Sequence, residues 1–330
     1  MIPSSPAPLV YFRVIADRIG RPGALVLDIG PGQVEALRPL TEAPAFKLLT
    51  TALPCFHRQE LAPALVAMLA AAGWSELPPG TLRRLDQPLV TSCLPSAARW
   101  LDGNWCMTAP AKPVGAQVAS RTRALQLVQL VAADAATHEI EALLRLDPTL
   151  AYNLLRLVNS VGIGGGRRVT SFAQALLILG RQQLRRWLNL MLFAARDGDN
   201  RASLLLARVM VRAGAIEQLA RLRGLDKYTQ EQGFMVGLFS LLGALFGMSM
   251  ADVLAPLALG DAVQHALLRK DGELGALLQV AEAAEQACLE QVAGQLKDLQ
   301  LAPAQFNQTM LETTAWMLGA LKPQQGAHHG

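Results

Sequence analysis

Apolar residues recur at helical spacing through most of the chain after residue 113, and most regularly between Ile140 and Trp187. Asp147-Pro148 is typical of a helix start, because the Asp side chain accepts a bond from a free N–H and proline has none to lose. The apolar positions that follow share one helical face, namely Leu150, Leu154, Leu157, Val158 and Val161. This pattern predicts an amphipathic helix.

Turn residues then divide this segment. Asn159-Ser160 and the glycine run at 162–166 end the first helix. Thr170-Ser171 starts the next, where Gln174 is spaced to complete a capping box on Ser171. Gly180 is a suitable C-terminal glycine for that helix. Further helices are predicted over residues 121–132, from Thr137, and over 182–195, 204–222, 233–251, 261–269, 273–296 and 303–321. Ser249 is expected to cap a short helix, with Asp252 three residues further on.

The first 112 residues have a different pattern. Leu9–Ile15 and Ala24–Ile29 read as short strands joined by a turn at residues 20–23. Residues 63–72 form a predicted amphipathic helix, and 89–91 a further strand. The sequence therefore predicts a mainly α protein, with a small mixed α/β domain at 1–112 and a helical domain at 113–330.

Composition narrows the class of protein. The chain is 52% hydrophobic and 17% charged, with a net charge of +4. Such a composition favours a packed globular protein and gives no strong attraction to nucleic acid. Four widely spaced cysteines favour reduced thiols in the cytoplasm over a zinc site or disulfides. The charge-free run at 233–251 is long enough for a membrane span, but its glycines and serines favour a buried helix.

Several linked motifs resemble the HDOD family, the HD-related output domain of bacterial signalling proteins. They read D-P-x-L-x-x-x-L-L-R-L-x-N-S, a glycine turn, and V-T-S-x-x-x-A-L-x-x-L-G. The resemblance spans residues 116–321 and implies signal output through a protein partner. The family-motif residues are Asp147, Pro148, Leu154, Leu155, Arg156, Asn159, Ser160 and Gly180.

Residues 11–29, Y-F-R-V-I-A-D-R-I-G-R-P-G-A-L-V-L-D-I, resemble the start of an EAL domain, the cyclic di-GMP phosphodiesterase fold. The metal-binding glutamate of that family would fall at or near Val26, so this resemblance implies a truncated, inactive domain. The segment V-L-D-I-G-P-G at 26–32 allows a second interpretation, because it resembles the first motif of a methyltransferase. A lone glycine turn supports it only weakly.

HD-superfamily phosphohydrolases hold divalent metals with a His-Asp pair. The corresponding segment of this chain is G-L-F-S-L-L-G, at residues 237–243. It places Ser240 at the histidine position and Leu241 at the aspartate position. No His-Asp dipeptide exists in the chain. From this we expect no metal, no cofactor and no enzymatic activity.

Basic residues offer a different chemistry. Arginines at four positions flank the 171–179 helix and could bind phosphate, namely Arg167, Arg168, Arg181 and Arg185. A solvated face that pairs with acidic neighbours is the simpler interpretation of these arginines. The predicted function is a non-catalytic signalling scaffold, and the alternatives are a cyclic di-GMP-sensing pseudo-enzyme or a residual metal-dependent phosphohydrolase.

Overall fold

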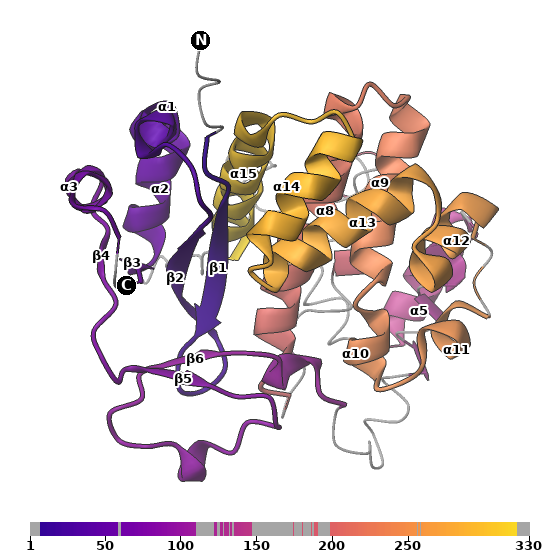
Figure 1. The fold of residues 1–330 in the computed structure, drawn as a ribbon. Helices are drawn as coiled ribbons and strands as arrows, with labels where there is room; N and C mark the ends of the chain where they lie inside the picture. The colour runs from indigo at the N-terminus through magenta and orange to yellow at the C-terminus, as the bar shows by residue number, and fades with distance from the viewer. Residues whose placement is uncertain are drawn as a thin grey trace.

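A computed structural model describes the chain at residues 7–58, 61–109, 199–255, 257 and 259–321. It also describes scattered positions at 122, 123, 126, 127, 129–131, 133, 135–146, 174, 180, 186 and 188–190. A small mixed sheet lies beside a larger array of helices (Figure 1). This confirms the predicted fold class.

The sheet has six strands in the order β4-β3-β2-β1-β6-β5. Strand β1 is antiparallel to both of its neighbours, while β2, β3 and β4 are mutually parallel and so are β5 and β6. All strands except β1 therefore run in one direction. Their bounds are β1 Val10–Ala16, β2 Pro22–Ile29, β3 Cys55–His57, β4 Ser75–Glu76, β5 Leu82–Arg84 and β6 Trp100–Asp102.

The two longest strands match the predicted hairpin, but the strand predicted at 89–91 is wrong. Thr91–Cys93 forms a 3-10 turn instead. The shorter strands were missed, because two or three residues contain no recognisable alternation. The small helices beside the sheet are η1 Val34–Leu37, α1 Arg38–Glu42, α2 Pro44–Ala52, α3 Pro63–Ala71 (as predicted) and η3 Trp105–Met107.

Alternation along β1 separates the two faces of the sheet. Phe12 belongs to the main core and meets the rings of Phe46 and Trp74 at 5.9 and 6.0 Å. On the opposite face Ile15 packs into a small separate cluster with Val26 and Ala24. The first face is thus the covered one, and the second continues into polar residues toward the ends of the strands.

The remaining described elements are helical: α5 Thr137–Arg145, α8 Ala202–Leu222, α9 Lys227–Phe239, α10 Leu242–Phe246, α11 Met250–Leu254, α12 Asp261–Arg269, α13 Gly272–Glu285, α14 Leu289–Asp298 and α15 Pro303–Leu321. Helix α8 lies at the centre and packs against α9, α13 and α15. Helices α12 and α15 agree with the predicted ranges. Among the described residues, no helix combines the length and apolarity that a membrane crossing requires.

Two predicted helices are each broken in the structure. The run at 233–251 is divided at Ser240-Leu241 and again at Gly247, which has φ 62°. The run at 273–296 breaks after Glu285, where Ala287 adopts φ 58°. Cys288 N–H donates to Ala283 O and Ala287 N–H to Ala284 O, the pair of bonds that closes a Schellman motif. This break escaped prediction because alanine occupies a position where glycine is usual.

The sheet and the helices share one continuous core. Helix α15 packs against both β1 and α2, so an element from the end of the sequence covers the N-terminal sheet (Figure 1). Asn307 of α15 accepts from Val10 N–H at 2.9 Å and donates to Pro8 O at 2.9 Å. Arg208 of α8 donates to Gly103 O at 2.8 Å. These contacts fix the sheet against the helices.

Candidate functional site

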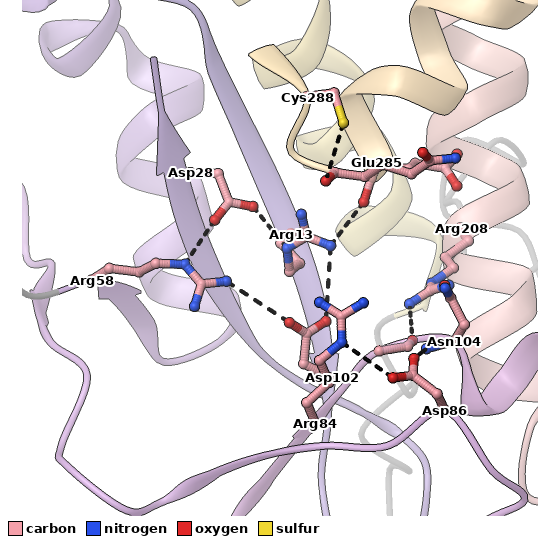
Figure 2. A network of polar contacts seen from close by, with 12 residues as sticks. Arg13, Asp28, Arg58, Arg84, Asp86, Asp102, Asn104, Arg208, Glu285 and Cys288 are labelled. Atoms are coloured by element: carbon pink, nitrogen blue, oxygen red, sulfur yellow. Dashed lines mark hydrogen bonds and ion pairs between the residues drawn. The ribbon is translucent and has the colours of Figure 1, made fainter. Parts of the chain in front are cut away.

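A cluster of charged side chains lies at the carboxyl ends of the parallel strands, on the face opposite the main core (Figure 2). Asp28, near the end of β2, accepts from Arg13 Nε at 2.7 Å and from Arg58 Nε at 2.9 Å. Asp28 is buried, with its side chain 6% exposed. Its two charge-assisted bonds compensate for the loss of water around the carboxylate.

Asp102, at the end of β6, faces the same two arginines but is held less closely. One carboxylate oxygen lies 3.8 Å from Arg13 Nη1 and the other 3.8 Å from Arg58 Nη2. Arg58 comes from the end of β3 and Asp102 from the far side of β1, so the sheet curves enough for side chains on separate strands to meet. We call Arg13, Asp28, Arg58 and Asp102 the edge cluster.

Two arginines at this edge are accessible to a ligand. The Arg58 side chain is 46% exposed, and that of Arg84, which shares its register with Asp102 in the β5–β6 ladder, is 70% exposed. Arg84 contacts Asp86 at 3.3 Å. The pKa of Asp86 lies below its usual range, mainly because Asn104 N–H donates to that carboxylate, with a smaller contribution from Arg84.

A second charged group lies between the helices. Arg212 of α8 donates to the two carboxylate oxygens of Glu285 at 2.7 and 2.6 Å, and to Ser240 Oγ at 2.8 Å. Glu282 lies 3.7 Å from Arg212 and accepts from Lys270 Nζ at 2.6 Å. We call Arg212, Ser240, Glu282 and Glu285 the inter-helix cluster.

Close packing of α8 and α9 brings Ser240 onto Arg212. Gly237 makes this possible, because a Cβ there would lie 2.5 Å from the Ala213 Cα. Asp226 caps the start of α9 by accepting from Thr229 N–H. Ser240 Oγ donates to Gly237 O at the helix end. The sequence at 237–240 therefore sets both the helix spacing and the position of the hydroxyl.

Glu285 joins the two clusters. Its backbone carbonyl accepts from Arg13 Nη1 at 2.8 Å, while its carboxylate holds Arg212. It can do both because α13 ends at this residue and frees the carbonyl from intrahelical bonding. A continuous chain of contacts thus runs from the edge of the sheet to Ser240.

Burial and charge act in opposite directions on these groups. Burial alone lowers the pKa of the Arg13 guanidinium, but Asp28 and Asp102 outweigh it and leave that pKa above its usual value. The pKa of Arg212 is raised in the same way, with burial opposing and Glu285 prevailing. Burial, followed by the nearby Glu285 carboxylate, raises the pKa of the Tyr11 hydroxyl. Both arginines therefore remain charged.

The structure places only some of the predicted site residues. Ser240 is half-buried against Arg212, and Leu241 is fully buried. Gly180 is exposed with φ 70°, the conformation expected of a C-terminal glycine. The rest lie outside the described residues: Asp147, Pro148, Leu154, Leu155, Arg156, Asn159, Ser160, Arg167, Arg168, Arg181 and Arg185. Their predicted roles stay predictions.

Sequence reasoning missed the edge cluster. Its signal was a charged residue among the apolar residues of a strand, such as Arg13 between Phe12 and Val14 or Asp28 between Leu27 and Ile29. Two other arginines of the helical region pair with acidic residues: Arg186 with Glu217, and Arg212 with Glu285. No group of three or more His, Cys, Asp or Glu side chains within the described positions is arranged to hold a metal.

Comparison with known proteins identifies the domain family to which residues 119–257 are similar. Residues 119–257 match the HDOD domain family, so this chain carries an HDOD domain over that range. The chain is 30% identical over 177 residues to "Cyclic di-GMP phosphodiesterase CdgJ" of Vibrio cholerae, a match that covers 54% of this chain and 40% of that protein. It is 27% identical over 142 residues to "Uncharacterized protein YuxH" of Bacillus subtilis, covering 42% of this chain and 34% of that protein.

The chain thus spans less than half the length of either curated relative. Among solved structures, a protein from Shewanella amazonensis named provisionally as a phosphohydrolase matches 60% of this chain and 91% of its own. That match has 14% identity and a TM-score of 0.44. We base the class on the sequence matches alone.

One prediction needs correction. We expected a protein without enzymatic activity, because Ser240 and Leu241 replace the metal-binding pair of HD enzymes. The relative that is 30% identical is named as a phosphodiesterase, which contradicts that expectation. The replacement of one pair of ligands excludes one metal site; it does not exclude catalysis elsewhere in the protein.

Proposed function

We propose that this chain is a signalling protein that recognises cyclic di-GMP at the edge cluster of its N-terminal sheet. The observation that carries the proposal is the match to a protein named as a cyclic di-GMP phosphodiesterase. The HDOD domain supports a role in signalling. Output through a protein partner, implied by the HDOD resemblance, is part of this proposal.

The geometry of the edge supports a phosphodiester ligand. Sites in α/β proteins form at the carboxyl ends of parallel strands, where Asp28, Arg58, Arg84 and Asp102 lie. Guanidinium groups bind phosphate oxygens through paired N–H donors. Arg58 of the edge cluster and Arg84 beside it are the exposed arginines, so they are the groups that a cyclic dinucleotide would meet.

The resemblance of the first residues to an EAL domain is consistent with this site. Val26, the position of the absent motif glutamate, is completely buried in the apolar cluster. Asp28 lies two residues further along the same face, at the strand end, but is already paired with Arg13 and Arg58. The proposal therefore assigns recognition to the arginines.

Phosphodiesterase activity is the second candidate function, favoured by the name of the same relative. One experiment addresses both. The full chain is titrated with cyclic di-GMP by calorimetry, and the mixture is then analysed by chromatography for the linear dinucleotide, with and without Mg²⁺ or Mn²⁺. Binding without conversion supports recognition alone, whereas conversion adds catalysis.

The binding site is tested with Arg84→Ala. Loss of one hydrogen bond to a charged group weakens binding by about 10- to 100-fold. Arg38→Ala is the matched control, because Arg38 is 65% exposed on α1 and pairs only with Glu42 at 3.9 Å among the contacts described. Equal affinity in the two variants would place the ligand elsewhere, and no binding to the unmodified chain would refute the proposal.

A further inference from the structure

Arg13 is the member of the edge cluster with competing acceptors. Its Nε donates to Asp28 at 2.7 Å. Its Nη1 donates to Glu285 O at 2.8 Å, while Asp102 Oδ1 lies 3.8 Å from the same nitrogen. A small rotation of the side chain would therefore exchange a carbonyl acceptor for a carboxylate.

Asp102 is the acceptor that is incompletely satisfied. It is 7% exposed, and its Oδ1 has no hydrogen-bond partner in the part of the chain that the structure describes. Its other oxygen depends on Arg58 Nη2 at 3.8 Å. A buried carboxylate strongly favours a direct donor. If Arg58 turned away, Arg13 would be the nearest cation left to Asp102.

Glu285 is the residue that would lose a hydrogen bond if Arg13 turned toward Asp102. Its carbonyl ends α13, and its carboxylate holds Arg212, which donates to Ser240 at the end of α9. The turn after Glu285 already contains Ala287 in a left-handed conformation, which is unfavourable for a residue with a Cβ. Loss of the bond between Arg13 and the Glu285 carbonyl would therefore affect this turn directly.

We propose that Arg13 couples the ligand site to the helical region by exchanging acceptors. A phosphodiester bound to Arg58 removes that guanidinium from Asp102, and Asp102 then takes Arg13 Nη1 from Glu285 O. The freed carbonyl loosens the α13–α14 turn and, through Arg212, the end of α9 at Ser240. The coupling rests on the proposed recognition of cyclic di-GMP, and it gives the HDOD domain a direct signal of ligand occupancy.

Hydrogen exchange measures the coupling on the full chain. The reporter amides are Gln286, Ala287 and Cys288, which are bonded within the turn, and Ser240, which donates to Val236 O. Saturating cyclic di-GMP is expected to speed their exchange by at least about fivefold, the lower end of allosteric coupling. Exchange in α12 is expected to stay constant.

A variant tests the mechanism without any ligand. Arg58→Ala removes the partner of Asp102 and should speed the same amides in the free protein. The double variant with Asp102→Asn should restore slow exchange, because the competing charge is gone. Asp271→Asn, the same chemical change at the exposed other end of α13, should restore nothing when combined with Arg58→Ala.

The outcomes separate the two proposals. Acceleration by Arg58→Ala that Asp102→Asn reverses supports the coupling, even if cyclic di-GMP has no effect and the recognition proposal fails. Binding of cyclic di-GMP with unchanged reporter amides overturns the coupling and leaves recognition intact. Acceleration in α12 as well as in the turn would reflect general destabilisation and would also overturn it.

Discussion

The two charged clusters differ in how completely their arginines are held. Arg212, between the helices, has two bonds of 2.7 and 2.6 Å to a single carboxylate and a third of 2.8 Å to Ser240. Arg13, at the edge of the sheet, has one short bond to Asp28 and divides the rest of its guanidinium between Glu285 O and Asp102. Both side chains are largely buried, at 5% and 12% exposed.

This difference separates a structural pair from an adjustable one. A bidentate pair that is buried on both sides has one arrangement of low energy, so Arg212 fixes α8, α9 and α13 relative to one another. The edge cluster has two carboxylates for two arginines, and only Asp28 is fully used. The Asp102 Oδ1 atom, which has no hydrogen-bond partner among the described residues, is therefore free to take a new donor.

The largest effect is expected from Glu285→Ala. The change leaves the buried Arg212 charge with Glu282, at 3.7 Å, as its one remaining carboxylate partner in the described part of the chain, which costs about 3–5 kcal/mol in the free energy of unfolding. Urea denaturation at constant m measures the loss. Glu290→Ala, an exposed change on α14, should lie within about 0.5 kcal/mol of the unmodified chain.

The double variant Arg212→Met with Glu285→Leu sharpens that result. Replacing both charges with apolar side chains removes the unpaired guanidinium, so the double variant should be more stable than Glu285→Ala. If Glu285→Ala and Glu290→Ala cost the same, the inter-helix cluster is not the rigid member of the comparison.

A smaller loss is expected from Asp28→Asn. The amide keeps the shape but weakens two charge-assisted bonds, for a cost of about 1.5–3 kcal/mol. Asp102 limits the loss, because it already lies 3.8 Å from both arginines and can move closer. The comparison uses the same urea measurement, with the exposed Asp86→Asn as control. A loss larger than that of Glu285→Ala would reverse the order of the two clusters.

The smallest loss of stability is expected from changing an exposed carboxylate, and the losses at the buried carboxylates can be compared with it. The pKa of Asp226, the cap of α9, lies below its usual 3.8, mainly because the Thr229 hydroxyl donates to it. Its folded pKa is thus lower than its unfolded pKa. The stabilisation is therefore present above the unfolded value and is lost as pH falls through the folded one.

Asp226→Ala should accordingly lower Tm at neutral pH by less than either buried variant, and the difference should shrink in acid as the carboxylate becomes protonated. Asp226→Asn is the control, because asparagine also caps helices but does not titrate. At neutral pH its Tm should lie closer to that of the unmodified chain than the Tm of Asp226→Ala does. A gap between Asp226→Ala and the unmodified chain that widens in acid would contradict the assignment.

Prediction from sequence worked where the signal is local. The hairpin of β1 and β2 followed from alternation and a glycine turn, and α11 followed from Ser249, which accepts from Asp252 N–H as a cap does. It failed at the end of α13, because Ala287 carries no breaking signal. It also failed at the two- and three-residue strands, which form only because a neighbouring strand is present to pair with them.

The sequence by itself determined the fold class, the β1–β2 hairpin, the Ser249 cap of α11 and the presence of an HDOD domain, since each can be recognised from patterns within the chain. Only the tertiary structure decided that Arg13 meets Glu285 and that Asn307 bonds to Val10, across sequence separations of 272 and 297 residues. The local periodicity of the sequence cannot predict such long-range contacts. They arise when the helices pack on the sheet and the buried charges must find partners.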